Sequence, residues 1–102
     1  MSMVVLDTET TGLSRKRDRV VEVAACRIDP SDGAVLDEFH RYVNPGIRVP
    51  DGAVKVHGLT NEFLADKPFF KDIAQELTSF IEGSTIVIHN APFDTGFLSA
   101  EY

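Results

Sequence analysis

The chain has 102 residues, which is enough for one domain with a single hydrophobic core and too few for two. Its apolar fraction of 43% and charged fraction of 25% are ordinary for a soluble globular protein. No apolar run approaches the length of a membrane span, and no signal peptide pattern opens the chain. A single cysteine, Cys26, excludes an internal disulfide framework and favours a reducing compartment. We therefore expect a cytoplasmic location and no membrane partner.

The net charge of −6 argues mildly against generic nucleic-acid binding, which favours a basic surface. That argument weakens if several of the acids form a metal site, because bound cations reverse the local sign. Although the net charge is negative, the chain contains one basic cluster, Arg15-Lys16-Arg17-Asp18-Arg19. It is either a basic patch or a solvated loop, and the sequence leaves both readings open.

The first half of the chain predicts three strands. Residues 3–8 form the first, which ends in a Thr-Thr-Gly turn. Residues 19–28 are apolar on both alternating faces, as is typical of an interior strand. A turn at 29–33 separates them from a strand over 35–43, in which Val35, Phe39 and Val43 share a face. The short turn predicts an antiparallel hairpin.

The second half predicts a loop, helices and one more strand. Residues 44–58 are rich in proline and glycine and predict an extended loop. A short helix begins at Thr60 or Asn61, and a longer helix follows over 69–82, where apolar residues recur at helical spacing. Residues 85–89 read as a strand, and a last helix opens at Pro92. This order predicts an α/β fold whose mixed sheet has flanking helices and at least one parallel pairing.

Two carboxylates, Asp7 and Glu9, follow an apolar run at the end of the first predicted strand. Residues i and i+2 of a strand point to the same face, with Cα atoms about 6.6 Å apart. Side chains at this spacing can converge on one divalent ion or bridge two ions about 3.5–4 Å apart. For an isolated Asp-x-Glu the alternative is a pair of solvated acids at a strand end.

A third carboxylate, Asp94, ends the segment His89-Asn90-Ala91-Pro92-Phe93-Asp94. If the strand over 85–89 runs beside the first strand, both end at the edge where α/β sheets keep their sites. Asp94 then lies in the first turn of the last helix, where an acid can also simply complement the helix dipole. Taken with Asp7 and Glu9, it predicts a metal site of three carboxylates.

Three ordered segments resemble those of the DEDD, or DnaQ-like, 3′–5′ exonucleases. Val5-Leu6-Asp7-Thr8-Glu9-Thr10-Thr11-Gly12-Leu13 resembles the first exonuclease motif, and His89-Asn90-Ala91-Pro92-Phe93-Asp94 with Phe97-Leu98 resembles the second. Between them, Val56-His57-Gly58-Leu59-Thr60 followed by Phe63-Leu64 is also similar. The likeness covers nearly the whole chain and is strongest to the proofreading epsilon-type subunits of bacterial DNA polymerase III.

The resemblance implies a ribonuclease H-like fold and two-metal hydrolysis of the 3′-terminal phosphodiester of single-stranded DNA. Asp7 would bridge two Mg²⁺ or Mn²⁺ ions, Glu9 would hold the ion that activates water, and Asp94 would complete the other. Hard oxygen ligands suit these ions better than Zn²⁺. A DNA polymerase subunit is the implied partner, and RNA is not excluded as a substrate.

The resemblance also implies the residues that bind the terminal nucleotide. The family uses the Thr10–Thr11–Gly12 turn and the loop around His57, and Leu13 is the candidate platform for base stacking. For His57 the alternative is a local hydrogen bond within the loop. Two residues of the second motif complete the expected substrate-binding set, Asn90 and Phe93.

The family carries a third motif, with a histidine or tyrosine base and a fourth metal-binding aspartate, which does not occur before Tyr102. We therefore expect residues 1–102 to form one exonuclease-type domain that is truncated before this motif. His40 is expected on the surface of the third strand, and His89 in an architectural role. Because a catalytic base contributes about 10²–10⁴-fold, the chain alone is expected to be weak or inactive. Apolar surface exposed by the truncation would favour a homodimer.

Two other classes of function compete with this one. A non-catalytic module that binds a nucleotide or a polymerase through the same pocket would keep a remnant metal site without turnover. A magnesium-dependent phosphatase of the haloacid dehalogenase type is the other, but such enzymes place a second Asp where this chain has Glu9.

Overall fold

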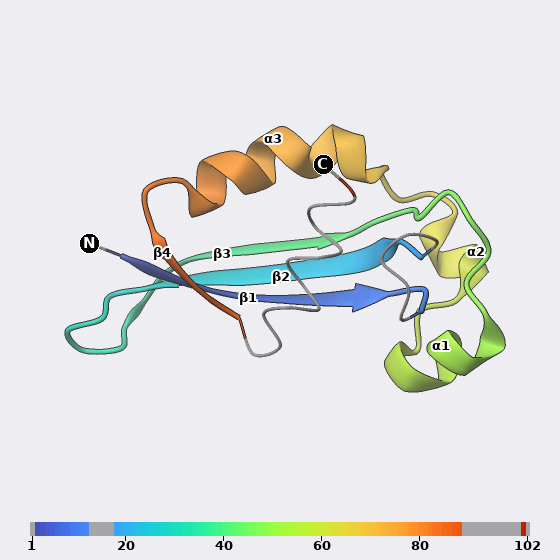
Figure 1. The fold of residues 1–102 in the computed structure, drawn as a ribbon, viewed down its shortest axis with the longest axis horizontal. Helices are drawn as coiled ribbons and strands as arrows, with labels where there is room; N and C mark the ends of the chain where they lie inside the picture. Colours follow the sequence, from blue (N-terminus) through green and yellow to red (C-terminus); the bar gives the residue numbers. More distant parts are fainter. Residues whose placement is uncertain (1, 13–17, 89–100, 102) are drawn as a thin grey trace.

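The computed structural model describes residues 2–12, 18–88 and 101 (Figure 1). In chain order they form three strands, three helices and a further strand: β1 Met3–Thr10, β2 Val20–Ile28, β3 Val35–Tyr42, α1 Asp51–His57, α2 Asn61–Leu64, α3 Phe70–Ile81 and β4 Thr85–Ile88. None of the helices formed by these residues is long and apolar enough to cross a membrane.

The strands form one mixed sheet in the order β3-β2-β1-β4. β2 pairs antiparallel with both β1 and β3, as the short turn between β2 and β3 predicted. β4 returns parallel to β1 after the crossover through α3, so the predicted parallel pairing and its position beside the first strand are confirmed. The α/β class with flanking helices is confirmed as well.

The main core lies between α3 and one face of the sheet (Figure 1). The predicted apolar stripe of α3 is confirmed, since Phe70, Ile73, Leu77 and Phe80 are all buried. Full burial of one such side chain contributes roughly 1.5–3 kcal/mol. The sheet supplies the other half of this core from alternating positions: Val4, Leu6, Val20, Val23, Ala25, Phe39 and Val43.

A smaller core cluster lies where α1 and α2 cover one end of the sheet (Figure 1). Its buried members are Val21, Val49 and Leu64, and partly buried residues of α1 pack against them. α2 begins as predicted, because the Thr60 side chain accepts a hydrogen bond from the Phe63 N–H at the N-cap. This cluster is what fixes α1 relative to the end of β1.

The predicted extended loop over 44–58 is wrong in part, because α1 occupies Asp51–His57. Pro50 and Gly52 are residues typical of turns, and no residue of α1 is buried, so no apolar stripe marked this helix. Gly58 ends the helix with φ 75°, a left-handed conformation that glycine adopts without strain, and its N–H donates to the Val54 carbonyl.

Other differences from the predictions are confined to element ends. β1 runs two residues further than predicted, to Thr10, and β3 ends at Tyr42. Val35 does not share the buried face with Phe39, because at the start of the edge strand β3 it is 58% exposed. The predicted last helix and His89 lie outside the described residues.

Candidate functional site

The two acids of the first motif share one face of β1. Burial alternates along the strand, with Val4, Leu6, Thr8 and Thr10 buried on the side that faces α3. Asp7 and Glu9 therefore project from the opposite face, Asp7 exposed and Glu9 half-buried. The Asp7 carboxylate accepts a hydrogen bond from the Thr8 N–H at 3.0 Å.

The end of β4 lies beside this acid pair. Its last register pair joins Ile88 to Leu6, the residue before Asp7. β4 therefore ends next to Asp7, and the segment over 89–94 follows it in the sequence. Three predicted site residues of that segment, Asn90, Phe93 and Asp94, lie outside the described residues, as does Leu13. Within the described part of the chain, no group of three or more His, Cys, Asp or Glu side chains could hold a metal ion.

The turn after β1 is held closed by Thr11, which is buried. Its N–H donates to the Arg19 carbonyl at 2.8 Å, and its Oγ1 accepts from the Arg19 N–H at 3.0 Å. The same hydroxyl donates to the Asp18 carboxylate at 2.9 Å. Thr10 closes the turn from the other side, since its Oγ1 donates to the Gly12 carbonyl at 2.6 Å.

Gly12 lies close to the Asp18 carboxylate in this turn. A Cβ at this position would lie 2.6 Å from an Asp18 carboxylate oxygen, which is a clash. Any larger residue at position 12 would therefore push Asp18 away from Thr11. The Thr-Thr-Gly sequence thus has a geometric explanation: two hydroxyls make the bonds that fix the turn, and the glycine leaves room for their acidic partner.

The His57 ring joins the end of α1 to the end of β1. Its Nε2 lies 3.1 Å from the Thr10 carbonyl oxygen, and its Nδ1 accepts from the Leu59 N–H at 3.0 Å. A carbonyl can only accept and an N–H can only donate, so these partners select the neutral tautomer that carries its proton on Nε2. Both ring nitrogens are engaged, which is the local hydrogen-bonding role that the sequence left open.

A cavity of about 510 Å³ lies between the β1 turn and α1. This volume is in the usual range for a small-molecule site. It brings together the predicted residues Glu9, Thr10, Thr11, Gly12 and His57. The remaining lining residues were not predicted from the sequence: Thr8, Asp18, Pro50, Gly52, Ala53 and Val56.

The unpredicted wall of this cavity comes mostly from α1, whose residues were predicted to form a loop. Pro50, Gly52 and Ala53 gave no separate chemical signal. Asp18 did stand out, as the single acid within a basic cluster, but only the fold brings it to Thr11. Arg19 also belongs to this basic cluster, and its guanidinium lies 3.2 Å from the Glu101 carboxylate. The same carboxylate accepts a hydrogen bond from the Val20 N–H at 2.8 Å.

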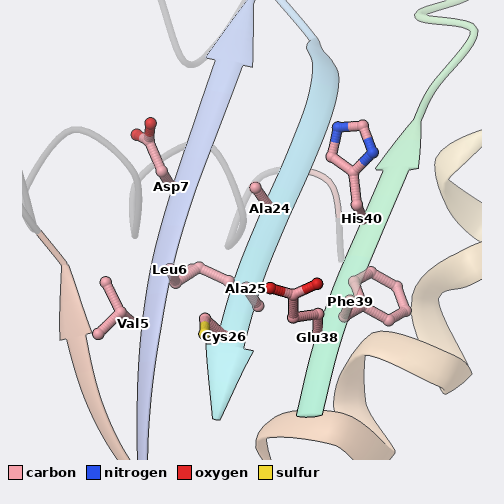
Figure 2. A pocket seen from close by; sticks show the side chains of 9 residues that line it. All are labelled: Val5, Leu6, Asp7, Ala24, Ala25, Cys26, Glu38, Phe39 and His40. Carbon is pink, nitrogen blue, oxygen red and sulfur yellow. The ribbon is translucent and has the colours of Figure 1, made fainter. Parts of the chain in front are cut away.

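A second hollow, of about 370 Å³, lies on the sheet face that carries the acids (Figure 2). Figure 2 shows Asp7 at one side of it and His40 at the other, with Ala24 between them. The His40 side chain is 47% exposed, so its predicted surface position is confirmed. Its Nε2 lies 2.5 Å from the Glu22 carboxylate.

The fold is that of the ribonuclease H-like class, and the first motif places its acid pair on the strand β1. The chain belongs to the exonuclease family, whose sequence model matches residues 4–102. This confirms the resemblance drawn from the two motifs.

Among individual proteins, the chain is similar to the epsilon subunit of DNA polymerase III. It is 45% identical to that of Buchnera aphidicola subsp. Acyrthosiphon pisum and 46% identical to that of Rickettsia prowazekii, in each case over 96% of this chain. It spans 43% of the length of each of these relatives.

Solved structures show the same fold. Exonuclease X in complex with 5′ overhanging duplex DNA superposes with a TM-score of 0.75 at 30% identity, over 93% of this chain and 52% of that one. The nuclease domain of 3′hExo, a DEDDh family member bound to rAMP, superposes with a TM-score of 0.82 at 16% identity, over 98% of this chain and 57% of that one. At that identity, the second likeness supports the ribonuclease H-like fold alone.

Proposed function

We propose that this chain carries the metal-binding and nucleotide-binding part of a 3′–5′ exonuclease that acts on single-stranded DNA. The observation that carries the proposal is the position of the acid pair. Asp7 and Glu9 leave β1 on one face, and Glu9 also lines the cavity that the Thr10–Gly12 turn and His57 enclose. A carboxylate site and a nucleotide-sized cavity are therefore adjacent.

The donor set fits two Mg²⁺ or Mn²⁺ ions. Carboxylate oxygens are the ligands that these hard cations prefer, and exonucleases of this family depend on divalent metal ions. Asp7 would bridge both ions, Glu9 would hold one of them, and Asp94 would complete the other. Such ions supply an activated water and neutralise the charge that develops on the scissile phosphate.

The cavity would hold the 3′-terminal nucleotide. Thr10, Thr11 and Gly12 line one wall, and α1 forms the other. His57 fixes the distance between these walls through its two hydrogen bonds. Leu13, Asn90 and Phe93 are proposed to complete the contacts with the sugar and base.

A binding module without turnover is the competing proposal. Such a module would hold a nucleotide in the same cavity of about 510 Å³ beside Glu9, without hydrolysing it. The relatives are subunits of a DNA polymerase, so a polymerase subunit is the proposed partner in either case. The two proposals differ in whether a bound 3′ end is hydrolysed.

Degradation of a 5′-labelled single-stranded oligonucleotide with Mn²⁺ tests the exonuclease proposal. We expect slow shortening from the 3′ end, which is lost in Asp7→Ala. An RNA oligonucleotide of the same sequence, tested in parallel, shows whether the enzyme distinguishes deoxyribose from ribose. Binding of the oligonucleotide without shortening, by a chain whose fold is confirmed, would support the binding module instead. Cleavage of p-nitrophenyl phosphate but not of a thymidine-5′-phosphate nitrophenyl ester would indicate a phosphatase and contradict both.

A further inference from the structure

The sheet face that carries the acid pair holds a third carboxylate in line with Glu9. Glu22 of β2 is the register partner of Glu9 on β1, and Tyr42 of β3 is the register partner of Glu22. Directly opposed residues of antiparallel strands point to the same face, with Cβ atoms about 4.5–5.5 Å apart. Like charges so placed repel each other. The carboxylate of Glu22 thus stands within reach of the proposed metal site.

The adjoining row of the sheet supplies the partner that holds Glu22. Here Asp7, Ala24 and His40 are register partners across β1, β2 and β3 (Figure 2). The His40 Nε2 lies 2.5 Å from the Glu22 carboxylate, and the ring meets that of Tyr42 edge-on with centroids 4.7 Å apart. His40 thus fixes Glu22 on the β3 side, away from β1.

We infer that His40 is a positioning residue, which keeps the Glu22 carboxylate turned away from Glu9 and out of the metal site. The inference rests on the proposed function, since it concerns the same site. With this contact in place, Glu22 does not join Asp7 and Glu9 in a metal-binding group among the described residues. Without it, the flexible Glu22 side chain can take rotamers that approach Glu9 and add a further carboxylate ligand.

The expected effect is modest because the pair is partly in solvent. The Glu22 side chain is 24% exposed and that of His40 is 47% exposed. A partly exposed contact of this kind contributes a few tenths of a kcal/mol to about 1 kcal/mol, which converts to roughly a two- to fivefold change in an equilibrium.

A double-mutant cycle with Mn²⁺ titrations tests the inference on the whole chain. We expect His40→Ala to bind Mn²⁺ about two- to fivefold more tightly than the wild type, because the freed Glu22 carboxylate reaches the cation. Adding Glu22→Gln to His40→Ala removes that gain, while His40→Gln, whose amide can still donate to Glu22, restores wild-type binding. Glu38→Gln is the matched control, since it removes an acid from the same face of β3.

A metal-free cycle keeps the inference separate from the proposed function. Glu9→Gln should raise the folding equilibrium constant at least about twofold more in a His40→Ala background than in the wild type, because Glu9 then faces an untethered Glu22. Equal effects in both backgrounds, with unchanged Mn²⁺ affinity in His40→Ala, would overturn the inference. Asp7→Asn binding Mn²⁺ as well as the wild type would instead overturn the proposed metal site, and the metal-free cycle would still decide the role of His40.

Discussion

Two small residues at the end of β1, Thr11 and Gly12, fix the geometry of the turn that follows the strand. Thr11 makes hydrogen bonds to Arg19 and Asp18, and Gly12 is the residue that leaves space for the Asp18 carboxylate. The acid pair is thus followed at once by a rigid turn that forms one wall of the cavity. Rigid support of this kind keeps binding groups in fixed positions before a ligand arrives.

Gly12→Ala tests this constraint. The new Cβ would lie 2.6 Å from the Asp18 carboxylate and would displace it from Thr11. We expect a loss of about 1–2 kcal/mol in the free energy of unfolding, measured by urea denaturation. Gly52→Ala is the control, because a Cβ there meets nothing within 4 Å and alanine favours helix. Equal stability of the two variants would contradict this account of the turn.

The turn between β2 and β3 provides a residue-scale prediction about pH. The Ser31 hydroxyl and N–H both donate to the Asp29 carboxylate, and these bonds lower the pKa of Asp29 below its ordinary value. Because the folded pKa is lowered, the contribution to stability is present above the unfolded pKa and is lost as pH falls through the folded one.

Ser31→Ala should raise the pKa of Asp29 part of the way to its ordinary value, because the hydroxyl donor is lost and the backbone donor remains. A carboxyl ¹³C NMR titration of both proteins measures this directly. An identical Asp29 titration in the variant would show that the hydroxyl bond is absent in solution.

At the scale of elements, α1 depends on its surroundings more than any other helix of the described chain. It has no buried residue of its own and is held by the cluster of Val21, Val49 and Leu64 and by the His57 bonds. Because α1 forms one wall of the cavity, packing at this cluster behind the wall should control nucleotide binding.

Leu64→Ala tests this dependence, since Leu64 is buried and does not line the cavity. We expect a loss of about 2–5 kcal/mol in unfolding free energy, and weaker binding of a nucleoside monophosphate in a calorimetric titration. Leu36→Ala on the exposed start of β3 is the control and should change stability by less than about 0.5 kcal/mol. Unchanged nucleotide affinity in a folded Leu64→Ala protein would show that the position of α1 does not depend on this cluster.

The elements also show what the sequence could and could not predict. β2 and α3 were predictable because Val20–Ile28 is apolar on both faces and the α3 stripe has a clear helical period. α1 was not, because its residues are exposed or half-buried and its neighbours Pro50 and Gly58 are typical of turns. The acid pair was predictable from strand alternation alone, whereas Asp18 and the α1 wall of the cavity depend on long-range packing.

At the scale of the whole molecule, the order β3-β2-β1-β4 places the acid-bearing strand inside the sheet. β1 is paired with β2 along its length and with β4 over Met3–Leu6, so the backbone that leads to Asp7 is hydrogen-bonded on both sides. The site is therefore built on an interior strand rather than on an edge.

Hydrogen exchange followed by NMR checks this arrangement. The slowest backbone amides are expected in β1 and β2, because their opening requires nearly global unfolding. Amides on the outer edges of β3 and β4 should exchange faster by about a hundredfold or more. Uniform protection across the described strands would contradict the assigned edges.

The central claim is that Asp7 and Glu9 share a divalent cation on the face of the sheet opposite α3. A Mn²⁺ titration followed by water-proton relaxation tests it without requiring turnover. We predict saturable binding that is weakened at least about tenfold by Asp7→Asn and by Glu9→Gln, and that changes less than about twofold in Glu38→Gln. Equal binding by the wild type and both site variants would contradict the claim.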